Sequence, residues 1–158
     1  MIACWLADDA QTDRLGRALA ESCPPRAVVH LQGDLGAGKS TLARALLRAL
    51  GVEGTIRSPT YTLVERYPLA SGGEAWHMDL YRIGDPGELE FLGLDADEAT
   101  LWLVEWPERG AGTLPPADLR IELAVEGAGR RAELVGVSAV GRGWVGRLAA
   151  EASFAADS

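Results

Sequence analysis

The segment from residue 33 to residue 40 constrains this chain more than any other part of the sequence. It reads Gly-Asp-Leu-Gly-Ala-Gly-Lys-Ser and fits the pattern G-x-x-x-x-G-K-[ST] at every position. An apolar run at 27–31 precedes it and predicts a buried strand, while the amphipathic stretch 38–50 predicts a helix after it. A glycine-rich turn between a strand and a helix lets backbone N–H groups surround phosphate oxygens. The residues assigned to nucleotide phosphate binding are Gly33, Asp34, Leu35, Gly36, Ala37, Gly38, Lys39, Ser40 and Thr41.

Lys39 is the only lysine among the 15 lysine and arginine residues of the chain. A sequence that uses arginine for every other cation indicates a position where a compact ammonium group is needed. We expect Lys39 to be solvated and to reach the β- and γ-phosphates of a nucleotide. The Ser40 hydroxyl would ligate Mg²⁺, and Thr41 would add a donor to the α-phosphate. The alternative is a glycine-rich turn that merely exposes a lysine.

Two acidic residues stand at the ends of predicted strands. Glu105 comes directly after the apolar run 101–104, and Asp79 stands at the end of the run 75–78. Ligands of open α/β sheets bind beyond the carboxyl ends of the strands, where an acid can hold Mg²⁺. We therefore predict catalytic roles for Lys39, Asp79 and Glu105. Metal ligation is assigned to Ser40, Asp79 and Glu105. Which acid holds the metal and which orients water stays open, as does the alternative of solvated acids at strand ends.

The segment Ser-Pro-Thr-Tyr-Thr at 58–62 lies between the loop helix and the middle strands. A threonine hydroxyl in such a position can sense a γ-phosphate or Mg²⁺, which makes Thr60 and Thr62 candidate switch residues. The pattern alone favours a β-rich surface segment. On pattern alone, Trp106 caps the core after Glu105. His30 and His77 are predicted to be structural. Arg57, Arg66 and Arg82 are predicted to be surface cations, although any of them could approach a phosphate.

The remaining patterns predict one α/β domain over residues 1–158, with three layers and a mixed central sheet, typical of P-loop NTPases. Strands are expected at 1–6, 61–67, 75–81, 119–125 and 132–137. Helices are expected from Asp8 or Asp9 to Cys23, at 86–92 and near 143–152.

Composition narrows the functional class. The net charge of −8 and the pI near 4.7 argue against a general surface for a nucleic-acid backbone. The two cysteines are too few for a disulfide framework, and no apolar run approaches the length of a membrane span. The first residues carry no basic start and no long apolar stretch, so we expect no signal peptide, no membrane association and a cytoplasmic location.

Five sequence blocks, taken together and in order, resemble the bacterial TsaE (YjeE) family. They span about Gly33 to Glu108, and beyond Glu108 the similarity supports the fold only. The blocks are GDLGAGKST at 33–41, SPTYTLVE at 58–65, HMDLYR at 77–82, ELE at 88–90 with LGL at 92–94, and VEWPE at 104–108.

The resemblance implies an ATPase that uses ATP and Mg²⁺ and works with the TsaB–TsaD complex. That system makes N6-threonylcarbamoyladenosine (t6A) at position 37 of tRNAs that read A-starting codons, and the chain would reach tRNA only indirectly, through its partners. The resemblance places Lys39, Ser40 and Thr41 on the nucleotide and Asp79 and Glu105 at the metal and water. It also places Thr60 and Thr62 in a switch-like segment and Trp106 beside the active site.

Two other classes stay open. A small-molecule kinase with the same loop would need a second substrate pocket with anchoring cations, which the sequence does not reveal. A signalling-type GTPase or a passive nucleotide-binding module is the third possibility. The guanine-reading Asn-Lys-x-Asp motif is impossible here, because the only lysine already lies in the glycine-rich loop.

Overall fold

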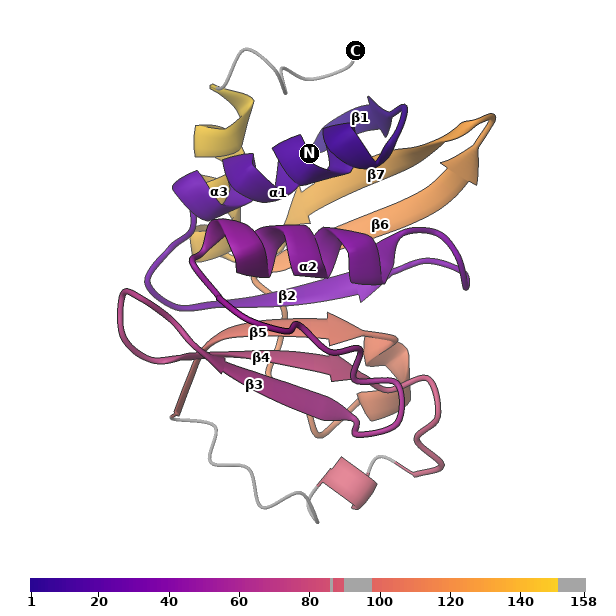
Figure 1. Cartoon of the computed structure of the whole chain (residues 1–158), viewed down its shortest axis with the longest axis vertical. Coiled ribbons are helices and arrows are strands. Elements are labelled where there is room, and N and C mark those ends of the chain that lie inside the picture. The colour runs from indigo at the N-terminus through magenta and orange to yellow at the C-terminus, as the bar shows by residue number, and fades with distance from the viewer. Residues whose placement is uncertain (86, 90–97, 151–158) are drawn as a thin grey trace.

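A computed structural model describes residues 1–85, 87–89 and 98–150. This part of the chain forms a seven-stranded mixed sheet in the order β1-β7-β6-β2-β5-β4-β3 (Figure 1). The strands are β1 (Ile2–Leu6), β2 (Ala27–Gln32), β3 (Val64–Pro68), β4 (Glu74–Asp79), β5 (Ala99–Glu105), β6 (Leu119–Glu126) and β7 (Gly129–Gly136).

The centre of the sheet is parallel and its flanks are antiparallel. β2 pairs in parallel with β5 and β6, and β5 pairs in parallel with β4. β7 runs antiparallel to β6 and β1, and β3 runs antiparallel to β4. Since β2, β4 and β5 all end at one edge, Asp79 stands directly opposite Glu105 in the register, and Glu105 opposite Leu31. The residues that follow these strands therefore share one end of the sheet.

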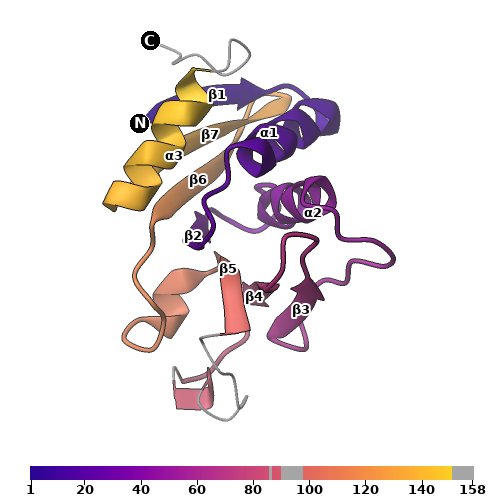
Figure 2. The ribbon, with the colours of Figure 1, turned by 90° about the vertical axis from the view of Figure 1, so that its left-hand side faces the viewer.

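Helices cover both faces and make three layers (Figure 2). α1 (Asp9–Glu21) and α2 (Lys39–Ala49) lie on one face, and α3 (Ala139–Ala149) lies on the other. The first two helices approach closely at Gly16, where a Cβ would lie 2.6 Å from Cβ of Ala45. A larger side chain at position 16 would push α1 and α2 apart, so glycine at this position allows the two helices to pack closely.

Two apolar clusters fill the layers. The larger joins α1, α2 and α3 to the strands and includes the fully buried Leu15, Val29, Leu47 and Trp144. A smaller cluster lies under the ends of β4 and β5 and consists of Met78, Leu80, Ile83, Leu89 and Val104. This second cluster supports the strand ends that carry the two acids.

The predicted fold class is confirmed, and several element boundaries differ from the prediction. α3 begins at Ala139 rather than near 143, because the Ser138 side chain caps it by accepting from the Gly141 N–H at 3.0 Å. β3 begins at Val64 rather than 61, because Leu63 has φ 67° and a left-handed residue cannot continue a strand. Of the helix expected at 86–92, the described residues 87–89 form a short 3-10 turn, and the others lie outside the described residues. Glu90 of the ELE block and the whole LGL block at 92–94 also lie outside the described residues.

Candidate active site

The glycine-rich loop joins β2 to α2 and presents the N-terminus of that helix. Gly38 is the N-cap residue, with φ 106°, a left-handed conformation that glycine adopts without strain. A Cβ at Gly33 would lie 2.3 Å from the Leu123 carbonyl oxygen, so only glycine fits where the loop leaves the sheet. Among the described residues, no side chain caps the N-terminus of α2. Its first N–H groups are therefore free to receive an anion, as the sequence predicted for this loop.

Lys39 lies folded over the loop and is only 5% exposed, so the expectation of a solvated ammonium was wrong. Its Nζ donates to the carbonyl oxygens of Gly33 and, at 3.0 Å, Asp34. It also lies 4.4 Å from the ring centroid of Trp106. Burial lowers the pKa of Lys39, and the nearby carboxylates, chiefly Glu105, oppose that shift. The ammonium is thus held in place before any phosphate arrives.

Ser40, Glu105 and Asp79 bring oxygen atoms together beside this lysine. The Ser40 hydroxyl lies 3.0 Å from each carboxylate oxygen of Glu105, and Glu105 is 2% exposed. Asp79 is also buried, and its Oδ1 accepts from the Tyr81 N–H at 3.0 Å. Burial raises the pKa of Asp79, opposed by the Tyr81 hydrogen bond. Among the described salt bridges, neither carboxylate pairs with an arginine or a lysine. Burying two such carboxylates costs free energy, and a cation placed between them would offset that cost.

This donor set fits Mg²⁺. The ion prefers oxygen ligands and is bound by one or two carboxylates while it keeps several waters. Within the described residues, no group of three or more His, Cys, Asp or Glu side chains could hold a metal by itself. A metal here would complete its shell with water and phosphate oxygens, as Mg²⁺ does in nucleotide sites.

Trp106 turns the chain away from β5. Its φ is 56°, an uncommon left-handed conformation for a large side chain, and it leads into the 3-10 helix η3 (Pro107–Gly110). Its ring packs on Tyr81, with centroids 4.9 Å apart, as well as over Lys39. Trp106 therefore borders the site and also packs against the smaller core cluster.

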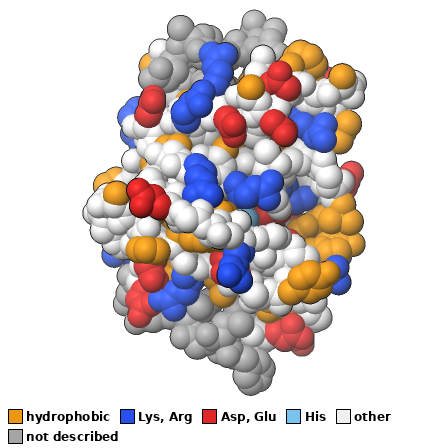
Figure 3. Space-filling view, viewed as in Figure 1, with side chains coloured by type: hydrophobic (Ala, Val, Ile, Leu, Met, Phe, Trp, Pro, Cys, Tyr) orange, Lys and Arg blue, Asp and Glu red, His pale blue; other side chains and the backbone are white. Residues whose placement is uncertain are grey.

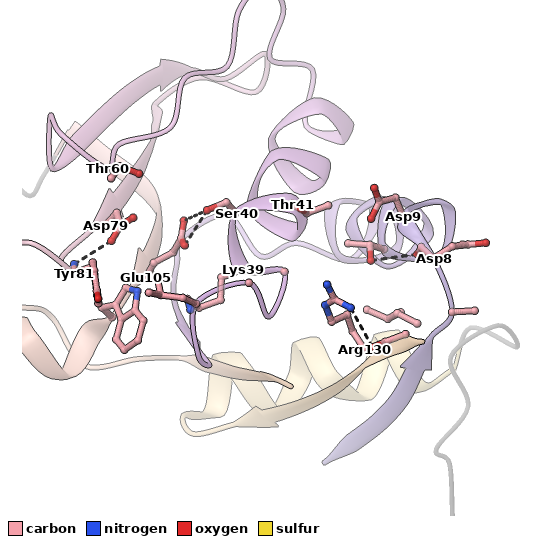
Figure 4. Close-up of a pocket in the computed structure, with 18 of the residues that line it drawn as sticks. Asp8, Asp9, Lys39, Ser40, Thr41, Thr60, Asp79, Tyr81, Glu105 and Arg130 are labelled. Carbon is pink, nitrogen blue, oxygen red and sulfur yellow. Dashed lines mark hydrogen bonds between the residues drawn. The ribbon is translucent and has the colours of Figure 1, made fainter. Parts of the chain in front are cut away.

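These groups line one pocket of about 970 Å³ (Figure 4). The predicted residues in its lining are Leu35, Gly36, Gly38, Lys39, Ser40, Thr41, Thr60, Asp79, Glu105 and Trp106. Gly33, Asp34 and Ala37 belong to the loop but do not line the pocket. Thr62 does not line it either, and its hydroxyl donates to Glu65 at 3.0 Å. The structure thus separates the two candidate switch threonines.

The structure also brings in residues that the sequence had not placed. Arg130, at the start of β7, faces the loop from the opposite wall, beside Asp8 and Asp9 at the start of α1 (Figure 4). No local signal identifies Arg130, because its position depends on how β7 pairs in the sheet. Arg82 lines the pocket and lies 4.9 Å over the Tyr61 ring, whereas Arg57 is not part of the lining.

His77, predicted to be structural, lies directly behind Glu105. Its Nε2 is 2.6 Å from Oε2 of Glu105, and the side chain is 1% exposed. A signal for this was present in the sequence: residues 77 and 79 share one face of a strand, since side chains alternate.

Comparison with known proteins decides the family. The family described as "Threonylcarbamoyl adenosine biosynthesis protein TsaE" matches residues 6–132. The chain belongs to the TsaE family. The Haemophilus influenzae tRNA threonylcarbamoyladenosine biosynthesis protein TsaE is 39% identical over 145 residues, which cover 87% of this chain and 91% of that protein. The Streptomyces coelicolor TsaE is 38% identical over 135 residues, covering 82% and 91%.

The crystal structure of Bacillus subtilis YdiB shows the same fold, with a TM-score of 0.76 at 24% identity, over 94% of each chain. The family resemblance read from the five blocks and the P-loop NTPase-like fold are both confirmed. In the described part of this TsaE-family chain, no helix has the length and apolar character needed to cross a membrane.

Proposed function

We propose that this TsaE-family chain is a Mg²⁺-dependent ATPase that supports t6A modification of tRNA position 37 by acting on a TsaB–TsaD complex. One observation carries the proposal: Ser40 and Glu105 meet beside Lys39 at the uncapped N-terminus of α2. A loop with free N–H groups, a fixed ammonium and paired interior acids is suited to phosphoryl chemistry, in which positioning and charge stabilisation do most of the work.

Each residue has a distinct task in this mechanism. The loop backbone and the helix N-terminus bind the phosphates. Lys39, already desolvated and oriented by the Gly33 and Asp34 carbonyls, neutralises charge that develops on the transferring phosphoryl group. Ser40, Glu105 and Asp79 would hold Mg²⁺, which supplies charge neutralisation when bound. An acid that does not ligate the metal directly would orient the attacking water.

The charges of the pocket set the orientation of the nucleotide. Asp79, Glu105 and Lys39 occupy one end, and Arg130 with Asp8 and Asp9 at the start of α1 occupies the other (Figure 4). The γ-phosphate belongs at the end with Ser40, Asp79 and Glu105, where a bound metal would neutralise it, so the base belongs near Arg130. A Cβ at Gly38 would lie 3.9 Å from Cγ and Nε of Arg130, close enough for this arginine to cover a nucleoside beside the loop. We propose ATP over GTP because the chain lacks the guanine-reading motif.

Two features of the chain favour a partner protein that acts on this site: the positions of the pocket arginines and the charge of the surface. Of the arginines that line the pocket, Arg82 lies over Tyr61 and Arg130 lies at the end away from Asp79 and Glu105. An arginine supplied by a partner can add ~10³–10⁵-fold to hydrolysis at such a site. On the face that carries α1 and α2, basic and acidic side chains are interspersed (Figure 3), and the net charge is −8. Both observations favour contact with tRNA through TsaB–TsaD.

The test is phosphate release by the chain alone, then with TsaB–TsaD, then with tRNA added. We expect slow hydrolysis that the partners change substantially, together with t6A formation that requires this chain and Mg-ATP. Fast turnover that TsaB–TsaD leave unaltered would indicate an independent enzyme and contradict the proposal.

A further inference from the structure

His77 lies against the proposed site without a role in it so far. It is on β4, and its Nε2 contacts Oε2 of Glu105 at 2.6 Å. Its Nδ1 is buried and has no hydrogen-bond partner among the described residues. The hydrogen bond to a carboxylate places a proton on Nε2, because an ionised carboxylate only accepts. Among the described residues, the His77 side chain therefore forms its hydrogen bond with Glu105.

The sheet register explains how the contact arises. His77 stands opposite Leu103 and Asp79 stands opposite Glu105. Since residues two apart share a face, His77 lies one step deeper in the sheet than Asp79, on the same side. From there it reaches the inner oxygen of Glu105, while the pocket lies beyond the strand ends.

Glu105 is consequently held from two directions. Ser40 donates to its oxygens from α2, and His77 donates to Oε2 from β4. Asp79 is held differently, since it accepts a main-chain N–H from Tyr81 that no side-chain substitution removes. The orientation of Glu105 thus depends on two replaceable side chains, of which His77 is the buried one, whereas Asp79 is held by the main chain.

We propose that His77 is the positioning residue that fixes the Glu105 carboxylate toward Ser40 and the pocket. Its consequence for metal and water rests on the proposed function. Without the Nε2 donor, Oε2 of Glu105 would keep only the Ser40 hydroxyl, which it shares with Oε1, and the buried carboxylate would be free to rotate. Groups that orient a metal-site ligand from behind typically change metal affinity or activity by about 10–100-fold when they are replaced.

The experiment compares His77→Leu, which removes the donor, with His77→Gln, whose amide nitrogen can take the place of Nε2. His30→Leu is the matched control, because the His30 Nε2 has no described partner and the residue does not line the pocket. Each variant is assayed for phosphate release, for ADP affinity with and without Mg²⁺, and for unfolding temperature.

For His77→Leu we expect turnover about 10–100-fold lower and most of the Mg²⁺-dependent part of ADP affinity lost. ADP affinity without Mg²⁺ should stay native, and His77→Gln should recover much of both losses. Native turnover and native Mg²⁺ dependence in His77→Leu would overturn the proposal. Equal losses in the Leu and Gln variants, accompanied by equal falls in unfolding temperature, would show a packing role and also overturn it.

Crystal structures of the native chain and the variants separate this proposal from the proposed function. We expect Glu105 to leave Ser40 in His77→Leu and to stay in His77→Gln. If His77→Leu fails to fold, a native Glu105 position in His77→Gln with native Mg²⁺ dependence supports the proposal, and a displaced carboxylate counts against it. A native chain without Mg²⁺-dependent hydrolysis would contradict the proposed function, while the Glu105 position would still decide the role of His77.

Discussion

The glycine-rich loop and the acidic wall of the pocket reach the same site by different routes. The loop is built from consecutive residues between β2 and α2, and its geometry follows from its own glycines. The acidic wall combines β4 and β5, which become neighbours only when the parallel sheet forms. Its key contacts, from Glu105 to Ser40 and from Glu105 to His77, join residues far apart in the chain. Local sequence thus builds the loop that we propose binds phosphates, and topology assembles the acids that we propose act on them.

The largest effect is expected from a substitution in the glycine-rich loop. Lys39→Ala should lower hydrolysis by ~10²–10³-fold and weaken ATP binding, because it removes the fixed ammonium from the phosphates. The unfolding temperature should fall by only a few degrees, since the lysine bonds loop carbonyls and does not fill the core. Titration with ATP and a thermal melt measure both quantities. Arg44→Ala, on the exposed face of the same helix, is the control. Native ATP affinity in Lys39→Ala would show that the loop is not part of the nucleotide-binding site.

The acidic half should respond differently. Glu105→Gln and Asp79→Asn should each lower Mg²⁺-dependent hydrolysis by ~10²-fold while ATP affinity without Mg²⁺ stays within about threefold of native. In the proposed mechanism the acids serve metal and water, whereas the loop backbone binds phosphate. Phosphate release and equilibrium binding, measured on the same samples, separate the two halves. A variant that hydrolyses ATP at the native rate would show that its acid lies outside the mechanism.

A smaller effect is expected at the wall of the pocket that carries Arg130. Arg130→Ala should weaken ATP binding by about threefold to tenfold, the size expected for the loss of a cation–π contact with a base. Competition against a fluorescent nucleotide measures the change. Arg131→Ala is the matched control, because Arg131 points to the other face of β7 and contacts Glu133 at 3.4 Å. Equal affinities for the two variants would place the base elsewhere.

The smallest effect concerns stability and pH. Burial raises the pKa of Asp79 above its usual value of 3.8. A raised acid pKa contributes stability below the usual value, and that contribution is lost as pH rises through the folded-state pKa. Asp79→Asn, without nucleotide or metal, should therefore melt about 2 °C higher than native at pH 7, with the difference shrinking toward pH 3. A lower melting temperature at pH 7 would mean that the ionised acid stabilises the fold.

The same contrast explains what the sequence could predict. The loop, its strand and helix, and the acids at strand ends follow from local patterns, and the structure places most of them in one pocket. Arg130 could not be found, because its place depends on the pairing of β7 with β6 and β1. The burial of Lys39 was missed because Trp106, after β5, covers it. Thr60 and Thr62 looked equivalent until the left-handed turn at Leu63 and the Glu65 contact separated them.

The central claim is that a nucleotide binds between the glycine-rich loop and the acidic wall, with its phosphates on the loop and its metal at Asp79 and Glu105. The most direct measurement is a crystal structure of this chain with Mg²⁺ and a non-hydrolysable ATP analogue. The account predicts phosphates on the N-terminus of α2 and Mg²⁺ ligated by the Ser40 hydroxyl, with Glu105 or Asp79 bound to it directly or through water. A nucleotide bound elsewhere, or a metal that contacts neither Ser40 nor either acid, would contradict it.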